Sequence, residues 1–188
     1  MKVNFSGRCP LPLEAHAPPV LQGYALRLCP AEPAATQLTA AINAMAERES
    51  TPSFRPHLTL LGAMAGPEAL RIAQVERLAL RLQPVPLPVT AVTARPDYFR
   101  GVVLEVALTA ELRRAHELAR ELLQYADGGA YRPHLSVVYG ALPLLRKAEL
   151  TAELAHLAGL ALTGEYLELV ALDGPPDAWQ IVFQAKLG

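Results

Sequence analysis

The chain has 188 residues, of which 52% are hydrophobic and 19% are charged, and its formal net charge at pH 7 is −1. This length allows one domain with a sizeable core, and this composition is that of a globular chain rather than a disordered one. The near-zero charge offers no basic stripe for the phosphates of duplex nucleic acid, so we expect no duplex partner. The near-zero charge is compatible with a small anionic ligand that a few polar side chains hold.

The two cysteines, Cys9 and Cys29, do not make a disulfide framework, and we expect two reduced thiols in a cytoplasmic protein. No Cys/His cluster in the sequence has the spacing of zinc ligands, and no apolar run is long enough to cross a membrane. Prolines interrupt the N-terminal stretch, which lacks the apolar segment of a secretion signal. We therefore interpret residues 1–20 as a proline-rich arm beside a single domain that spans residues 21–188.

In the first half of this domain, strands alternate with amphipathic helices. Residues 22–29 predict a strand, and an apolar stripe across residues 38–45 predicts a helix after it. A second strand is expected from His57 to Leu61, and a second helix places its apolar residues at 72–82. The prolines at 84, 86 and 88 lack a backbone donor, so the stretch around them is expected to be an edge strand.

The second half continues the same alternation. Residues 101–108 predict a buried strand, residues 110–126 a third helix, and residues 134–139 another strand. A fourth helix is expected around Leu150–Leu157, and two strands end the chain. The last one alternates apolar and polar residues from Trp179 onward. The pattern predicts an α+β protein without a linker long enough to separate independent domains.

An internal repeat is the most informative feature of the sequence. Residues 54–62 read FRPHLTLLG, and residues 131–140 read YRPHLSVVYG. An aromatic residue, Arg, Pro, His, Leu, a hydroxyl residue and two aliphatic residues match in order. The second copy has one extra residue, Tyr139, before its glycine. Each copy begins a predicted strand and precedes a predicted helix, which indicates two similar lobes that each contribute one copy.

Side chains alternate along a strand, so His57 shares one face with Thr59, and His134 shares one face with Ser136. Two such strands side by side would line a cleft with two imidazoles and two hydroxyls. Cleavage of a phosphodiester by water needs a base for the water and an acid for the leaving oxygen, and histidine fills either role near neutral pH. The hydroxyls can donate to the phosphate oxygens. Incidental histidines on ordinary strands are the alternative interpretation, and the repetition argues against it.

The residues also resemble a known family. His57-Leu58-Thr59 and His134-Leu135-Ser136 are similar to the two His-x-Thr/Ser motifs of the two-histidine (2H) phosphoesterase superfamily. Residues 133–140 (PHLSVVYG) resemble the second motif of its cyclic phosphodiesterase branch, known from plants and yeast. Residues 98–104 (YFRGVVL) resemble its central strand, and residues 169–172 with Trp179 and Val182 resemble its C-terminal hairpin.

This resemblance implies a bilobal α+β fold with two pseudo-symmetric lobes, each an antiparallel sheet flanked by helices, around a central cleft. It implies hydrolysis of ADP-ribose 1″,2″-cyclic phosphate and of nucleoside 2′,3′-cyclic phosphates. The implied catalytic residues are His57, Thr59, His134 and Ser136, and Tyr139 is implied as a wall for the base or sugar. Since no carboxylate cluster accompanies the histidines in the sequence, we expect neither a metal nor another cofactor.

Three further residues have two interpretations each. Arg27 stands where the plant enzymes have a tryptophan, and it either contacts a phosphate or is a solvated strand residue. Tyr98 is expected to bind substrate at the cleft rim, with core packing as the alternative. We expect Arg55 and Arg132, which precede the two histidines, to be surface residues, although contact with phosphate stays open. His116 is expected on a solvated helix surface.

Two other functions compete with cyclic phosphodiesterase activity. One is a 2′-5′ RNA ligase-like enzyme acting on RNA 2′,3′-cyclic phosphate ends, which usually carries threonine in its second motif and would need more basic cleft residues. The other is a nucleotide-binding module without turnover, against which the intact motifs argue. The expected partner is therefore a small cyclic phosphate nucleotide or an RNA end, and the protein is expected to be a monomer. The sequence does not distinguish the acid from the base.

Overall fold

The computed structural model describes residues 18–126 and 129–188. Cys9 and almost all of the predicted arm lie outside them. In chain order the elements of the described residues are β1 (Tyr24–Pro30), α1 (Ala34–Glu49), β2 (Leu58–Met64), α2 (Glu68–Ala79), β3 (Val85–Ala94), the 3₁₀ turn η1 (Tyr98–Arg100), β4 (Val102–Val106), α3 (Ala110–Leu122), β5 (His134–Val138), α4 (Leu144–Glu153), the 3₁₀ turn η2 (Leu154–Leu157), β6 (Ala161–Ala171), the 3₁₀ turn η3 (Pro176–Ala178) and β7 (Gln180–Lys186).

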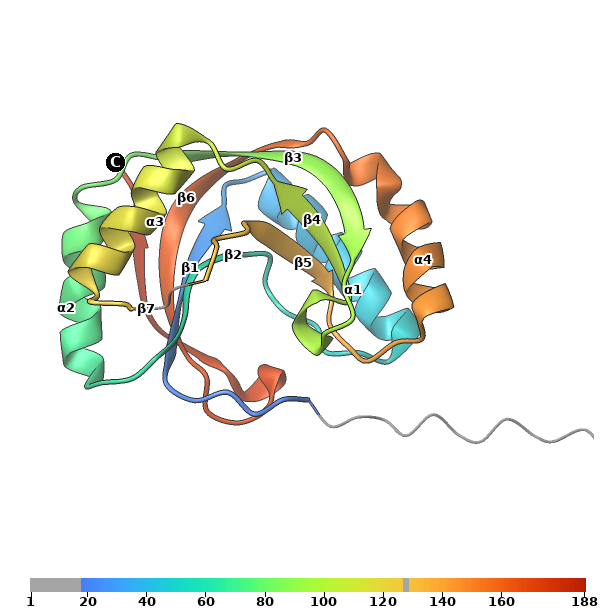
Figure 1. The fold of residues 1–188 in the computed structure, drawn as a ribbon, viewed down its shortest axis with the longest axis horizontal. Coiled ribbons are helices and arrows are strands. Elements are labelled where there is room, and N and C mark those ends of the chain that lie inside the picture. The colour runs from blue at the N-terminus through green and yellow to red at the C-terminus, as the bar shows by residue number, and fades with distance from the viewer. Residues whose placement is uncertain (1–17, 127–128) are drawn as a thin grey trace, which may run out of the picture.

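All strands belong to one antiparallel sheet with the order β1-β2-β5-β4-β3-β6-β7. An additional pairing joins β1 to β6, so the curved sheet of Figure 1 returns on itself. The long strand β6 makes this possible, because its residues 161–164 pair with β3 while the residues from Gly164 onward pair with β1. The predicted α+β fold with an antiparallel sheet and flanking helices is confirmed.

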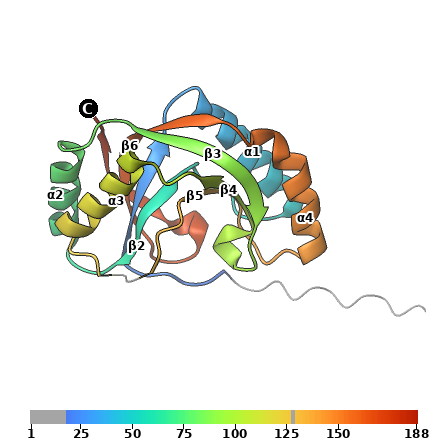
Figure 2. The same ribbon diagram turned by 45° about the horizontal axis from the view of Figure 1, so that its top comes forward.

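The helices cover the outer face of the sheet in two pairs. Helices α2 and α3 contact each other, with α2 on β6 and β7 and α3 on β2 and β3. Helices α1 and α4 lie at the other end, with α1 on β5 and α4 on β3 and β4 (Figures 1 and 2). The apolar stripe predicted for the first helix is the face that packs on the sheet, since Leu38, Ile42 and Met45 of α1 are buried. Burying apolar side chains in this way is the main favourable contribution to folding.

Strand β3 departs from the sequence prediction. The edge-strand assignment is wrong for β3 as a whole, because it lies between β4 and β6 in the sheet. Its proline half, residues 85–88, pairs with β6, whereas residues 89–94 pair with β4. Pro86 and Pro88 lack a backbone N–H group, and this is tolerated because their half of β3 pairs with only one strand, β6.

The last strand is also less regular than its sequence suggests. Ile181 pairs with Val170 and Phe183 pairs with Leu169, so Val182 forms an irregularity in the β6–β7 ladder. A bulge of this kind reverses the alternation of side chains beyond it. The alternation predicted from Trp179 onward, which would put Ile181 and Phe183 on one face, is accordingly interrupted, and Ile181 is exposed.

The two copies of the repeat lie on neighbouring strands. Strands β2 and β5 lie side by side (Figure 2). They pair antiparallel, and Leu58 is the partner of Leu135. Both leucines are buried in the core. An antiparallel register with this pair places His57 opposite Ser136 and Thr59 opposite His134. The adjacency that the repeat predicted is confirmed, and it is the feature that positions the site.

Candidate active site

Each motif histidine is held by its own backbone in the same way. Nδ1 of His57 lies 2.7 Å from the carbonyl oxygen of Arg55, and Nδ1 of His134 lies 2.9 Å from the carbonyl oxygen of Arg132. A carbonyl oxygen only accepts, so each Nδ1 carries the hydrogen and donates. In each motif a proline stands between the arginine and the histidine, and it keeps the backbone of the arginine extended. The Arg-Pro-His sequence therefore leaves Nε2 of each ring as the atom available for chemistry.

The two histidines line adjacent cavities. The first cavity has a volume of about 340 Å³, and its lining residues are Leu21, Ala25, Arg27, His57, Thr59, Gly62, Ala63, Phe99, Tyr125, Tyr139, Leu172 and Trp179. The second has a volume of about 230 Å³ and includes His134. Thr59 and Gly62 line both, so the β2 motif separates the cavities. This arrangement brings His57, Thr59 and His134 together.

His57 is the more enclosed of the two histidines, with 5% of its surface exposed. Burial lowers its pKa well below 6.5, and the positive charges of Arg27 and His134 lower it further. The hydrogen bond to the Arg55 carbonyl acts in the opposite direction but does not compensate. His57 is therefore a neutral imidazole near pH 7, with a lone pair on Nε2.

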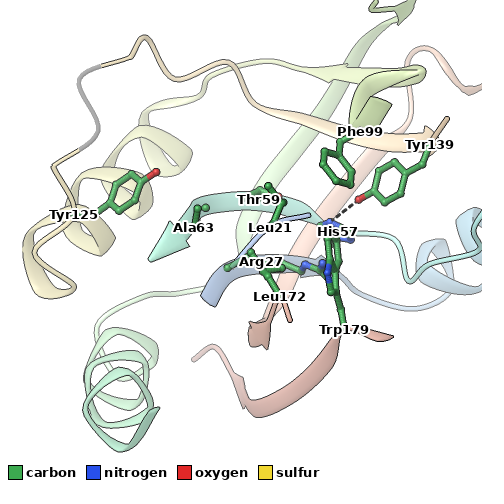
Figure 3. Close-up of a pocket in the computed structure, with 12 residues that line it drawn as sticks. Leu21, Arg27, His57, Thr59, Ala63, Phe99, Tyr125, Tyr139, Leu172 and Trp179 are labelled. Atoms are coloured by element: carbon green, nitrogen blue, oxygen red, sulfur yellow. Dashed lines mark hydrogen bonds between the residues drawn. The ribbon is translucent and has the colours of Figure 1, made fainter. Parts of the chain in front are cut away.

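Arg27 projects into the first cavity beside His57 (Figure 3). It is the partner of Thr59 on β2 and of Glu168 on β6, and it is 7% exposed. Its guanidinium carbon lies 5.2 Å from the centre of the Trp179 ring. Within the described part of the chain its Nε has no hydrogen-bond partner. The interpretation of Arg27 as a solvated strand residue is wrong, because strands on both sides enclose it.

Glu168 is a buried carboxylate that the sequence analysis did not identify. Arg55 Nη1 lies 2.7 Å from its Oε1, and Gln184 Nε2 donates to the same oxygen at 3.0 Å. Glu168 itself has no solvent exposure. Arg55 is thus more than a surface residue, although much of its side chain is exposed. The sequence does not reveal Glu168 as a neighbour of the motif, because only the long-range pairing of β1 with β6 brings it near Arg55.

His134 is half-buried and has an acidic neighbour. Glu105 of β4 is its partner in the sheet register. Partial burial raises the pKa of Glu105, but hydrogen bonds from Thr93 and Arg95 at 2.6 Å, with the charges of Arg95 and His134, lower it overall. Glu105 is therefore ionised at neutral pH. A negative charge therefore lies beside the imidazole of His134.

Ser136 and Tyr98 are placed differently from the sequence expectation. The hydroxyl of Ser136 donates to the carbonyl oxygen of Phe99 at 2.7 Å, and the residue is buried. Ser136 lines neither of the two cavities, although the unbroken β4–β5 register keeps it on the same face of the strand as His134. Tyr98 does not line them either. Residues 98–100 form a 3₁₀ turn rather than the start of a strand, and Phe99 enters the first cavity instead.

Tyr139 lines the first cavity, and its hydroxyl points at His57 (Figure 3). The oxygen lies 3.4 Å from Nε2 of His57. The ring stacks on Phe54 with 3.8 Å between centroids, and it meets Phe99 edge-on at 5.4 Å. Burial raises the pKa of Tyr139 to about 12, so the phenol keeps its hydrogen. The resemblance implied Tyr139 as a wall for the base or sugar, and the structure places its hydroxyl beside His57.

The second cavity contains a further histidine. His116 stacks on Tyr131 with 3.8 Å between ring centroids, and its Nδ1 lies 3.0 Å from the carbonyl oxygen of Leu60. It lines the cavity together with Arg100 and Arg132. The expectation of a solvated helix surface is therefore wrong for His116, because α3 packs on the motif strand β2.

The described residues contain no group of three or more His, Cys, Asp and Glu side chains that could hold a metal ion. Among the same residues, no helix is both long and apolar enough to span a bilayer. What converges on the cavities is instead a set of imidazole, hydroxyl and guanidinium groups. Hydroxyl and guanidinium groups can bind an oxyanion, and imidazoles can transfer protons to and from it.

Comparison with known proteins identifies the family of this chain and structures with a similar fold. Residues 30–176 match the family model of the 2′-5′ RNA ligase superfamily. Solved structures with a similar fold include TT0787 of Thermus thermophilus, with 15% identity and a TM-score of 0.60 over 87% of this chain and 97% of that one. They also include E. coli LigT complexed with NADP+, with 10% identity and a TM-score of 0.57 over 89% and 98%. LigT complexed with 3′-AMP has 10% identity and a TM-score of 0.55 over 88% and 98%. A search of curated proteins finds no match.

Proposed function

Because the chain belongs to the 2′-5′ RNA ligase superfamily of 2H phosphoesterases, we propose that it hydrolyses ribose cyclic phosphates without a metal. The substrates would be nucleoside 2′,3′-cyclic phosphates, ADP-ribose 1″,2″-cyclic phosphate, or both. The observation that carries the proposal is the matched pair of histidines on β2 and β5. Both are held through Nδ1 by the carbonyl two residues earlier, which leaves both Nε2 atoms for proton transfer.

The surroundings of the histidines support one division of the acid and base roles. His57 is neutral because it is buried beside Arg27, so it is the base that removes a proton from the attacking water. His134 lies opposite the ionised Glu105, so it is the acid that protonates the leaving ribose oxygen. The water oxygen forms a bond to phosphorus while one ring P–O bond breaks. The product is a phosphate monoester, and one proton has moved from water to the leaving oxygen.

Arg27 and Thr59 are suited to holding the phosphate. They are partners across β1 and β2, and both line the cavity that contains His57. The buried Nε of Arg27, which has no partner within the described residues, is a donor available to an anion. A guanidinium in such an enclosed site interacts strongly with a phosphate oxygen. The aromatic wall formed by Phe99 and Trp179 would accept the base or sugar.

RNA ends with a 2′,3′-cyclic phosphate are a second candidate substrate. The observation in their favour is the second cavity, where Arg100 and Arg132 lie beside His134. Arg100 shares its charge with Asp97, which it meets at 2.9 Å, so Arg132 is the better placed of the two to meet an anion. A further phosphate of an RNA strand would find a positive partner there. The complexes of E. coli LigT with 3′-AMP and NADP+ support a nucleotide ligand for this fold.

One assay separates these functions. The protein is incubated with adenosine 2′,3′-cyclic phosphate, with an RNA that ends in a cyclic phosphate and with a linear nucleotide, and the products are resolved with and without EDTA. We expect ring opening of the cyclic mononucleotide at the same rate with the chelator. Turnover of the RNA alone would favour the second candidate. Binding without turnover of any substrate would contradict the enzyme proposal, and loss of activity in EDTA would contradict its metal independence.

A further inference from the structure

Glu168 is a fully buried carboxylate close to the motif of His57, and it lines neither of the two cavities. Its Oε1 lies 2.7 Å from Nη1 of Arg55 and accepts a hydrogen bond from Gln184 at 3.0 Å. Its Oε2 has no hydrogen-bond partner within the described residues. A buried ion pair contributes little net stability, because the removal of both charges from water offsets their attraction. The carboxylate therefore needs an explanation other than stability.

The register of the sheet places Glu168 in a row of polar residues that leads to the motif. Glu168 is the partner of Gln184 on β7 and of Arg27 on β1, and Arg27 is in turn the partner of Thr59 on β2. Directly paired residues of neighbouring strands project from the same face of a sheet. Arg27 and Thr59 line the first cavity, so Glu168 lies on the face of the sheet that carries the site.

The loop before β2 is held by its side chains. Residues 51–57 belong to neither a helix nor a strand, and in the described part of the chain no backbone–backbone hydrogen bond involves Arg55. Phe54 stacks on an aromatic ring of the first cavity, and the guanidinium of Arg55 reaches Glu168 on β6. The carbonyl of Arg55 accepts from Nδ1 of His57 at 2.7 Å. The ion pair with Glu168 thus anchors the residue whose carbonyl holds the ring.

The second copy of the motif lacks this anchor. Among residues 18–126 and 129–188 no ion pair involves Arg132, which lines the second cavity instead. The proposed roles of the histidines explain the difference. A protonated imidazole has a hydrogen on both nitrogens, so an acid at His134 can donate from Nε2 whatever Nδ1 contacts. A neutral imidazole has one hydrogen, so a base at His57 works only while that hydrogen stays on Nδ1.

We propose that Glu168 is a positioning residue that holds His57 in the tautomer of a base by way of Arg55. The carboxylate anchors the guanidinium, the anchored loop keeps the Arg55 carbonyl on Nδ1, and Nε2 keeps its lone pair. Without the anchor the carbonyl leaves the ring, and the hydrogen exchanges between the two nitrogens. Molecules that carry it on Nε2 cannot accept a proton there. The effect on catalysis rests on the proposed function, whereas the tautomer is a property of the free protein.

The ion pair can be removed from either end. Glu168→Gln keeps the shape of the side chain and removes its charge, and the side chain of Arg55, which is 60% exposed, can then turn to water. Arg55→Gln leaves a buried carboxylate without its cation, and the double variant Arg55→Gln/Glu168→Gln leaves no buried charge. Glu49→Gln is the matched control. Glu49 is nearly as enclosed and lies 2.6 Å from Arg146, but it lines neither cavity.

Nitrogen NMR of the histidine side chains measures the tautomer without turnover. Nδ1 and Nε2 have different chemical shifts with and without a bound hydrogen, and His57→Gln in ¹⁵N-histidine-labelled protein assigns the signals of His57. At pH 7 we expect the hydrogen on Nδ1 in the wild type and in Glu49→Gln. Glu168→Gln, Arg55→Gln and the double variant should show shifts averaged between the nitrogens. Unchanged shifts of His57 in these variants, or a change in Glu168→Gln alone, would overturn the proposal.

Steady-state kinetics shows the consequence for the reaction. With adenosine 2′,3′-cyclic phosphate we expect kcat of Glu168→Gln to fall by up to about 10²-fold, which is the cost of misplacing a group by about 1 Å. KM should change little, because Glu168 lies outside the cavities. The single variants break the same link, so the double variant should be no slower than the slower of them. Losses that multiply, or an equal loss in Glu49→Gln, would overturn the proposal.

The two readouts separate this proposal from the proposed function. If no cyclic phosphate is hydrolysed but the tautomer of His57 changes as expected, the proposed function fails and the positioning role of Glu168 stands. If cyclic phosphate is hydrolysed and the tautomer does not change, the proposed function stands and the positioning role is wrong. A changed tautomer with an unchanged kcat would also overturn the role of Glu168 in catalysis.

Discussion

His57 and His134 have nearly the same local sequence but different electrostatic surroundings. Burial by Tyr139 and Phe54 and the charge of Arg27 from β1 lower the pKa of His57 and keep its imidazole neutral, whereas His134 lies opposite the ionised Glu105 of β4. An acid–base pair needs one proton shared between two sites, and in the proposed mechanism His134 carries that proton. Residues outside the two similar motifs would therefore give them the distinct roles that the proposed mechanism requires.

The first prediction is that each histidine is essential. His57→Ala and His134→Ala should each lower kcat by about 10²–10⁴-fold, which is the usual contribution of a general acid or base. Steady-state kinetics with a 2′,3′-cyclic nucleotide measures the loss, and circular dichroism checks that both variants are folded. A variant that is folded and retains nearly full activity would contradict the paired mechanism.

The second prediction concerns pH and Arg27. The base must be neutral to act, so kcat/KM should rise with pH through the pKa of His57, which burial and Arg27 hold below 6.5. Arg27→Gln removes a positive charge beside the imidazole. Removing it makes protonation of His57 easier, so the acid limb of the profile should move to higher pH.

The measurement is kcat/KM of both proteins from pH 4.5 to 9, together with Arg55→Gln as a control that changes a more exposed arginine. The Arg55 variant should shift the limb less, because the side chain of Arg55 is paired with Glu168 and meets His57 only through its backbone carbonyl. An acid limb at the same pH in the wild type and in Arg27→Gln would show that His57 is not the base.

At the scale of single elements, β6 carries the connection between the two ends of the sheet. Its pairing passes from β3 to β1 at Gly164, where the strand lies directly on Leu28. A Cβ atom at residue 164 would lie 2.5 Å from Cγ of Leu28, and Leu28 is completely buried. Glycine is required at this point by the close approach of another side chain rather than by backbone conformation.

The third prediction is that Gly164→Ala destabilises the protein by about 1–3 kcal/mol, the usual cost of overpacking a core. Urea unfolding measures the change in the free energy of unfolding. In a double-mutant cycle with Leu28→Ala, the combined loss should be smaller than the sum, because the shorter side chain makes room for the new methyl group. Strict additivity would mean that the two sites do not touch.

At the scale of the whole molecule, the two halves share one sheet. Strands β2 and β5 join the halves on one side, and β6 joins β3 to β1 on the other. The resemblance implied two lobes with a sheet each, yet these pairings leave neither half with a separate set of strand partners. Cooperative unfolding is the expected behaviour of such a continuous structure.

The fourth prediction is a single unfolding transition. Trp179, the only tryptophan of the sequence, reports on the first cavity by its fluorescence, and far-ultraviolet circular dichroism reports on the four helices of the described residues. The two signals should give the same urea midpoint and the same slope. Two separated midpoints would show that the halves unfold independently.

The sequence by itself determined the main elements and the motif. Apolar periodicity located the helices, and the repeated Arg-Pro-His placed each imidazole next to a carbonyl that holds its Nδ1. These features depend on residues within a few positions of one another, where spacing alone decides which side chains meet. The resemblance of the two motifs also predicted that their strands lie side by side.

Only the tertiary structure decided which groups surround the histidines. Arg27 reaches His57 through the pairing of β1 with β2, and Glu105 reaches His134 through the pairing of β4 with β5. Register between strands distant in the chain is set by the packing of the whole sheet, and local spacing does not contain it. One additional residue in β5 between Ser136 and Val138 likewise brought Tyr139 to the cavity of His57, because a single bulge reverses the alternation on which a strand's sequence pattern depends.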